Sequence, residues 1–143
     1  MRETSAVRGK VPGPAAAPTS RRSRTAPSPA RRILLVDDEP VQLRGLRRIL
    51  QERWHVDVAV GAVAAASLLA TARYDAVITD YDMPGYDGVW LLEQVARMYP
   101  RAQRVLLSGS GGELFAPHVR SGLIHRFVEK PAAADALLGL LGG

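Results

Sequence analysis

The chain has 143 residues, no cysteine and a net charge of +5, from 19 Lys and Arg against 14 Asp and Glu. This length suits about one domain with its own core, and the lack of cysteine excludes disulfides and thiolate metal sites. No apolar run approaches the roughly 20 residues of a membrane span, so no membrane partner is expected.

The positive charge is concentrated in residues 1–32, which hold eight Lys and Arg against one acid, a net charge of +7. Five prolines and many small residues accompany them, and such a segment buries too little apolar surface to offset its ordering entropy. We therefore expect a disordered basic tail over 1–32 and a mildly acidic domain over 33–143, where the net charge is −2.

This tail carries no aromatic residues between its arginines, so nucleic acid is expected to bind at most weakly, through the tail alone. Ala15–Ala17 is far too short to serve as the apolar region of a secretory signal. We therefore expect a cytoplasmic protein.

Buried strands and amphipathic helices alternate from residue 33 onward. Ile33–Val36 and Ala76–Ile78 are continuous apolar runs, typical of strands buried on both faces, and Val56–Val60 alternates. Strands are expected at 33–36, 56–60, 76–80, 104–107 and 124–128, and helices from 40 to 50, at 61–72, 89–98, within 111–122 and at 132–141. This alternation predicts an α/β fold with a parallel sheet.

Two of the helices carry more specific expectations. In the helix at 89–98, the spacing directs four apolar side chains towards the core, namely Leu91, Leu92, Val95 and Met98. In the segment 111–122, Pro117 is expected to begin or to kink the helix, because proline lacks a backbone N–H. This fourth helix is therefore expected to be short or irregular.

Polar side chains stand where the predicted strands end. Asp37 and Asp38 follow the first strand, Asp80 ends the third, Ser108 the fourth, and Lys130 follows the fifth. In a doubly wound sheet these carboxyl ends meet at one edge. Three carboxylates there repel one another unless a cation is present, and Mg²⁺ is the hard ion that suits them. Because a carboxylate can attack phosphorus, the pattern indicates phosphoryl transfer onto an aspartate.

Four blocks of the sequence occur in a familiar order: I-L-L-V-D-D-E-P, V-I-T-D-Y-D-M-P-G-Y-D-G, V-L-L-S-G and F-V-E-K-P. Together they resemble the response-regulator receiver domain of bacterial two-component signalling, over about residues 33–141. This resemblance implies a doubly wound, flavodoxin-like sheet of five parallel strands in the order 2-1-3-4-5, with helices on both faces.

The resemblance also assigns roles at the acidic end of the site. Asp80 would be the phosphoacceptor and a ligand of Mg²⁺, with Mn²⁺ as an alternative ion. Asp38 would bind the metal directly and Asp37 through water, and Asp82 would offer its backbone carbonyl.

Further roles fall on the last two blocks. Ser108 and Lys130 would contact the phosphoryl group, and the Lys130–Pro131 peptide would be cis. Ser108 would also act as the switch hydroxyl and Phe127 as the switch aromatic, which swings inward after phosphorylation. Asp87 is interpreted as an ordinary loop acid.

The function that the resemblance implies is that of a phosphoacceptor response regulator. A histidine kinase or phosphotransfer protein would donate the phosphoryl group to Asp80, and binding to a downstream protein target would change. Such a protein is a signalling phosphoacceptor and not an enzyme. Because no effector domain follows residue 141, we expect a stand-alone regulator or a piece of a larger protein.

Two other interpretations stay open. The run Asp80-Tyr81-Asp82 also matches the D-x-D core of aspartate-nucleophile phosphatases, although those enzymes usually carry a substrate-covering cap that a chain of this length leaves little room for. The second alternative is a receiver-shaped protein-interaction module that is never phosphorylated.

Overall fold

The computed structural model describes residues 31–131 and 134–142, in which strands and helices alternate. The elements are β1 (Arg32–Asp37), α1 (Pro40–Leu50), β2 (His55–Val60), α2 (Ala62–Thr71), β3 (Ala76–Asp80), α3 (Gly88–Met98), β4 (Gln103–Ser108), α4 (Gly112–Arg120), β5 (Arg126–Glu129) and α5 (Ala134–Gly142). The strands form one parallel sheet in the order β2-β1-β3-β4-β5. The predicted flavodoxin-like, doubly wound fold is therefore confirmed.

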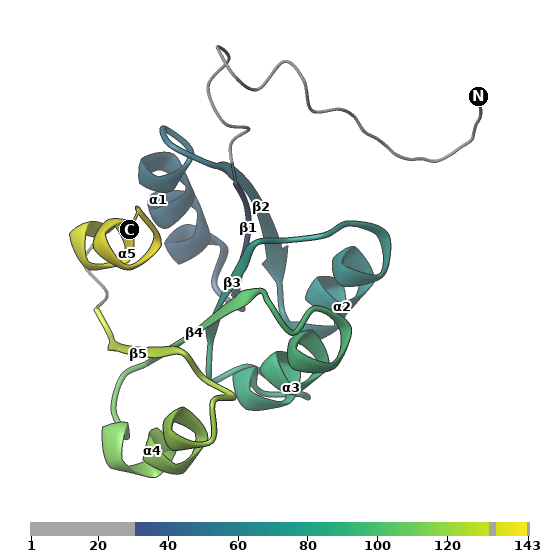
Figure 1. Cartoon of the computed structure of the whole chain (residues 1–143). Coiled ribbons are helices and arrows are strands. Elements are labelled where there is room, and N and C mark those ends of the chain that lie inside the picture. The colour runs from purple at the N-terminus through teal and green to yellow at the C-terminus, as the bar shows by residue number, and fades with distance from the viewer. Residues whose placement is uncertain (1–30, 132–133, 143) are drawn as a thin grey trace, which may run out of the picture.

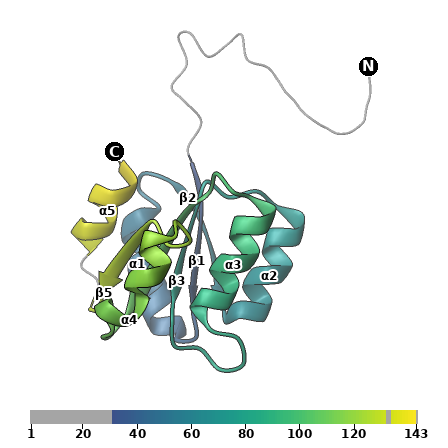
Figure 2. The same ribbon diagram turned by 60° about the horizontal axis from the view of Figure 1, so that its bottom comes forward.

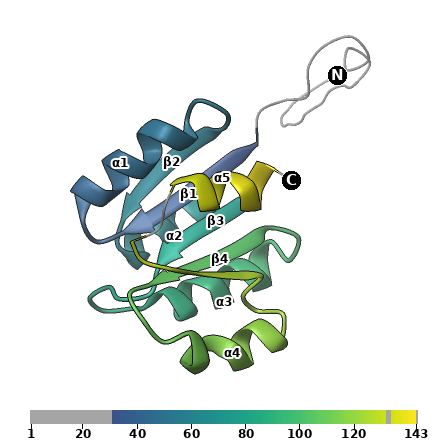
Figure 3. The ribbon, with the colours of Figure 1, turned by 90° about the vertical axis from the view of Figure 1, so that its left-hand side faces the viewer.

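Helices cover both faces of this sheet (Figure 1). The central strands show why, because their side chains alternate between two apolar cores. Leu34 and Val36 of β1 belong to the core under α2, α3 and α4. Ile33 and Leu35 belong to the core under α1 and α5. Two further views show α2 beside α3, and α5 across the sheet from α3 and α4 (Figures 2 and 3).

Met98 does not point into the core as predicted, because its side chain is 46% exposed. The other three members of the predicted set are fully buried. Met98 is the last residue of α3, and the next residue, Tyr99, packs against the core instead. The Tyr99 hydroxyl also donates a hydrogen bond to the Leu69 carbonyl at 2.7 Å, which joins the end of α3 to α2.

Pro117 does not begin α4, which starts five residues earlier at Gly112 and continues through the proline to Arg120. Because Pro117 lacks an N–H, it cannot bond to the carbonyl of Glu113, which lies in the first turn of this short helix. Phe115 is the only buried residue of α4, so one side chain anchors the helix in the core.

Within the described ranges, no helix combines the length and the hydrophobicity that a membrane span requires.

The start of α3 is fixed close to the end of β3. The Asp87 carboxylate caps the helix by accepting a hydrogen bond from the Trp90 N–H at 2.9 Å. The Gly88 N–H donates to the Tyr81 carbonyl at 2.9 Å, which draws the loop back onto the strand end. Asp87 therefore has a structural role, consistent with its interpretation as a loop acid.

The predicted tail over 1–32 lies outside the described residues except for Arg31 and Arg32. Arg32 does not belong to a disordered tail as predicted, because it is the first residue of β1.

Candidate functional site

Four strand ends meet at one edge of the sheet. β1 ends at Asp37, β3 at Asp80 and β4 at Ser108, and Lys130 directly follows β5. These strands are consecutive neighbours in the sheet, and all run in the same direction. Parallel strands place their carboxyl ends on one edge, so residues up to 93 positions apart in sequence are brought together.

Three carboxylates form the floor of the site. Asp37 and Asp80 are buried, with 2% and 4% exposure, and Asp38 is half-buried. Oxygens of the three carboxylates all lie within 4.8 Å of one another. Carboxylate oxygens are ligands that hard divalent cations prefer, so this donor set fits Mg²⁺.

Lys130 brings a positive charge to these carboxylates. Its Nζ donates hydrogen bonds to Asp80 Oδ1 at 3.1 Å and to Asp37 Oδ2 at 3.4 Å. The Lys130 backbone N–H donates to the Ser108 carbonyl at 2.8 Å, which ties the end of β5 to the end of β4. The Lys130–Pro131 peptide is cis. The lysine therefore reaches the acidic cluster from the far side of β4.

The electrostatics of the site reflect both burial and pairing. Burial raises the pKa of Asp80; the hydrogen bond from Lys130 opposes this rise and the charge of Asp37 adds to it. Burial likewise raises the pKa of Asp37, against the hydrogen bond from the Glu39 N–H. For Lys130, burial lowers the pKa, but the hydrogen bond to Asp80 and the charge of Asp37 outweigh it, so its pKa is raised. The ionised forms of these carboxylates are therefore disfavoured in the folded protein, and a bound cation would stabilise them.

An open hollow of about 620 Å³ lies over this cluster and gives access to it. Asp80, Asp38 and Lys130 line it, together with Asp82, which is exposed in the loop after β3. Asp82 is not a member of the three-carboxylate cluster. Its side chain therefore borders the site without joining its floor.

Ser108 lies at this edge, but its hydroxyl is turned to its own loop. The Oγ donates to the Ser110 carbonyl at 2.7 Å, and the side chain is buried. Within the described ranges the Ser108 hydroxyl makes no hydrogen bond to Asp80 or Lys130.

Phe127 lies away from the carboxylates, among aromatic rings on the α4 side of the sheet. Its ring centroid is 5.6 Å from that of Phe115, and the Phe115 centroid is 4.7 Å from that of Tyr81. Phe127 is half-buried in this arrangement. Through Phe115, it is therefore linked to the residue that follows Asp80.

Three further residues shape the site, and none of them was given a role from the sequence, although Met83 and Gly88 lie in the block V-I-T-D-Y-D-M-P-G-Y-D-G. Gln42 of α1 and Met83 of the loop after β3 line the hollow. Gly88 lies so close to the end of β3 that a Cβ would collide with the Asp80 backbone oxygen. That block was the available signal for Met83 and Gly88, whereas Gln42 lies outside all four blocks.

Most of the chain matches a known family. The family model for the response regulator receiver domain covers residues 33–141. The chain is 32% identical over 107 residues to the hydrogenase transcriptional regulatory protein HoxA of Cupriavidus necator, covering 74% of this chain and 22% of HoxA. It is 35% identical over 114 residues to the response regulator protein FleR of Pseudomonas aeruginosa, covering 78% and 24%. The chain thus spans about a fifth to a quarter of the length of these relatives.

Solved structures give the same result. A signal receiver domain of an HD domain-containing protein from Pseudomonas fluorescens has a TM-score of 0.74 at 32% identity, over 84% of this chain and 90% of that one. The chemotaxis response regulator CheY4 of Vibrio cholerae, at 22% identity, shares the fold with a TM-score of 0.72, over 79% and 97%. The chain belongs to the response regulator receiver domain family.

Proposed function

We propose that the chain accepts a phosphoryl group on Asp80 from a phosphohistidine donor, in a Mg²⁺-dependent reaction, and that this changes its binding to a protein partner. Receiver domains are signalling phosphoacceptors and generally bind Mg²⁺. The observation that carries the proposal is the contact between Lys130 Nζ and Asp80 Oδ1, at 3.1 Å, inside a cluster of three carboxylates.

The proposed metal ligands are the carboxylates of Asp37, Asp38 and Asp80 and the backbone carbonyl of Asp82. The support is the donor chemistry of the cluster and the position of Asp82 on the same hollow. When bound, Mg²⁺ would neutralise charge on the carboxylates and on the phosphoryl oxygens.

Asp80 acts as the nucleophile in this proposal. Lys130 Nζ bonds to one oxygen of this carboxylate, Oδ1, and so holds the Asp80 side chain in place for attack on phosphorus. A new O–P bond forms as the P–N bond of phosphohistidine breaks, and the electron pair of that bond stays on the ring nitrogen, which takes up a proton from water. The Lys130 ammonium is close enough to donate to the phosphoryl oxygens as their charge develops.

Ser108 and Phe127 would respond to the new charge. The Ser108 hydroxyl would exchange its bond to the Ser110 carbonyl for one to the phosphoryl group, because a charged acceptor forms the stronger hydrogen bond. Phe127 would then swing inward, and its ring contact with Phe115 would carry the change to α4. The altered face is the proposed binding site of the downstream target.

The donor would dock on an apolar groove beside the site. This hollow of about 560 Å³ is formed by α1 and the end of β5, and it includes Leu46, Ile49 and Pro131. Lys130 lines both this groove and the hollow over the carboxylates. A donor seated on the groove would therefore hold its phosphohistidine next to Asp80.

The test is the intact mass of the purified chain after incubation with Mg²⁺ and acetyl phosphate. One added phosphoryl group, lost in Asp80→Asn and in a Mg²⁺-free sample, is the expected result. No added mass, under conditions that label a known receiver, would favour the unphosphorylated interaction module. Steady hydrolysis of a phosphomonoester would instead favour the phosphatase reading of Asp80-Tyr81-Asp82.

A further inference from the structure

Charge is divided between the two edges of the sheet. The segments that leave the strands, at the edge of the candidate site, are 37–39, 60–61, 80–87, 108–111 and 129–131. They carry seven acids and one base, Lys130. The segments that lead into the strands, at the opposite edge, are 31–32, 51–56, 72–77, 99–104 and 121–127. These carry seven arginines and two acids, and we call this side the arginine edge.

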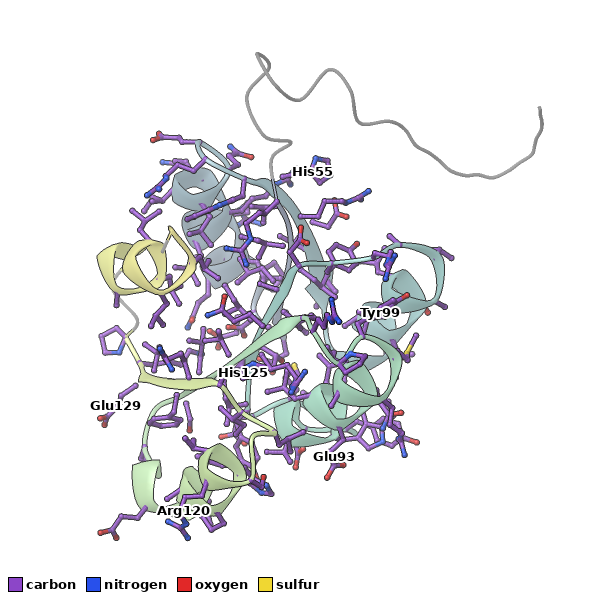
Figure 4. All side chains as sticks on the ribbon, in the orientation of Figure 1. His55, Glu93, Tyr99, Arg120, His125 and Glu129 are labelled. Carbon is purple, nitrogen blue, oxygen red and sulfur yellow. The ribbon has the colours of Figure 1, made fainter. Side chains whose placement is uncertain are left out.

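The arginine edge is assembled from all five strand approaches and not from one stretch of sequence. Figure 4 labels His55, Tyr99 and His125 on three of these segments, and Glu129 at the opposite end of β5 from His125. An arginine stands on every one of the five segments. The concentration of positive charge is therefore a property of the fold.

Folding accounts for three of the seven arginines. Arg104 is buried and donates to four backbone carbonyls at 2.8–3.1 Å, those of Pro100, Ala102, Gly122 and Leu123. Arg31 Nη1 donates to the Leu141 carbonyl at 2.6 Å, near the end of α5. Arg32 pairs with Asp57 at 3.1 Å. These side chains join segments of the domain to one another.

Arg73 and Arg101 have no such partners. Both are exposed, and within residues 31–131 and 134–142 neither forms an ion pair with a carboxylate. Both line an open hollow of about 800 Å³, together with Arg31 and Arg32. The acid in that lining is Asp75, whose carboxylate already accepts a hydrogen bond from the Arg32 N–H at 2.8 Å. The hollow is therefore strongly positive.

A second hollow extends this surface. It has a volume of about 350 Å³, shares Arg101 with the first hollow, and adds Arg126. The two hollows meet at Arg101, and arginines line both of them. A linear polyanion suits this arrangement, because its successive charges can meet successive guanidinium groups.

We propose that the arginine edge binds the phosphate backbone of a nucleic acid, with Arg73 and Arg101 as its main phosphate contacts. Guanidinium groups bind phosphate oxygens through paired N–H donors, and every base on this edge other than histidine is arginine. Residues 1–30 add six Lys and Arg against one acid, and the chain enters the domain at Arg31, on the same edge.

An anionic membrane fits this surface less well. Peripheral membrane contacts combine basic residues with exposed apolar side chains that enter the lipid. Of the large apolar residues that line the two hollows, Met98 is the one with an exposed side chain. The proposal does not depend on phosphorylation, since the two sites lie at opposite edges of the sheet.

The test uses the whole chain and a fluorescently labelled duplex DNA of about 20 base pairs, with binding followed by anisotropy between 50 and 200 mM salt. Each phosphate contact contributes about −0.9 to the slope of log K against log salt. The Arg73→Gln, Arg101→Gln double variant is expected to reduce that slope by about 1.8 and to weaken binding at 50 mM by more than about tenfold. The control, Arg44→Gln with Arg47→Gln on the exposed side of α1, makes the same change in net charge.

Four results would overturn the proposal. The first two are no DNA binding by the wild-type chain and an unchanged salt slope in the Arg73→Gln, Arg101→Gln variant. The other two are an equal loss of DNA binding in the α1 control, and tighter binding to phosphatidylserine vesicles than to DNA with the same dependence on Arg73 and Arg101. Urea unfolding of both variants serves as the check on folding. An unfolding midpoint equal to that of the wild type assigns any loss of binding to the surface itself.

Discussion

Replacement of Gly88 by alanine tests how closely the end of β3, which carries Asp80, is packed. A Cβ at this position would meet the Asp80 backbone oxygen, with Leu106 Cδ1 at 2.9 Å and the Tyr81 Cα at 3.0 Å. Two of these neighbours are backbone atoms and cannot rotate away. Overpacking of this kind costs about 1–3 kcal/mol, and the backbone contacts place Gly88→Ala at the upper end, about 3 kcal/mol.

Urea unfolding measures this cost. With an m value of about 2 kcal/mol/M, a loss of about 3 kcal/mol lowers the midpoint by about 1.5 M. The matched control is Gly45→Ala in the exposed middle of α1, where a Cβ meets nothing within 4 Å. That change is expected to stabilise the domain by about 0.5–1 kcal/mol, because glycine is a poor helix former. A Gly88→Ala midpoint equal to or above that of the wild type would refute the packing described here.

Three more predictions concern the candidate site. Mg²⁺ is expected to raise the free energy of unfolding, by about 2.7 kcal/mol when its concentration is 100 times its dissociation constant. A urea unfolding midpoint that does not change with Mg²⁺ would contradict the proposed ligands. Without metal, the raised pKa of Asp80 gives stability that is present below its unfolded value and is lost as pH rises through its folded value. Asp80→Asn should therefore gain stability relative to the wild type as pH rises above about 4, the unfolded pKa of an aspartate, in urea titrations with a chelator, and a difference that does not change with pH would refute this. Ile49→Glu in the apolar groove should slow phosphorylation from a phosphohistidine donor about tenfold or more. A tenfold change corresponds to a loss of about 1.4 kcal/mol in the free energy of docking. Its rate with acetyl phosphate should stay unchanged, and Val63→Glu on α2, which is also apolar and exposed, should affect neither rate.

The strands were predictable because their apolar runs encode burial on both faces. Ile33–Val36 and Ala76–Ile78 have no polar interruption, and every residue of both runs is buried. Polar residues at the ends of such strands then had to lie on one edge, which is why the approach of Lys130 to Asp37 could be expected from the pattern and the family resemblance. The spacing of apolar residues was a weaker guide at Met98, since Tyr99 competes for the same part of the core.

Other features depend on contacts that no local pattern contains. The direction of the Ser108 hydroxyl is set by the carbonyl of Ser110, two residues away in a loop whose shape the sequence does not reveal. The arginine edge is similarly hidden, because its residues are spread over five segments between 31 and 127. In the sequence, the basic tail is evident as a cluster of arginines, whereas Arg73 and Arg101 are isolated charges far apart along the chain.

The position of β5 at the margin of the sheet also matters while the protein is being made. The three clustered carboxylates lie at residues 37, 38 and 80, whereas the ammonium group that pairs with two of them is supplied by residue 130. A nascent chain that ends before Arg126 has all of the acids and none of the neutralising base. The last strand of the sheet to be synthesised is thus the one that completes the site, so a chain that ends before it lacks the pairing of Lys130 with Asp37 and Asp80.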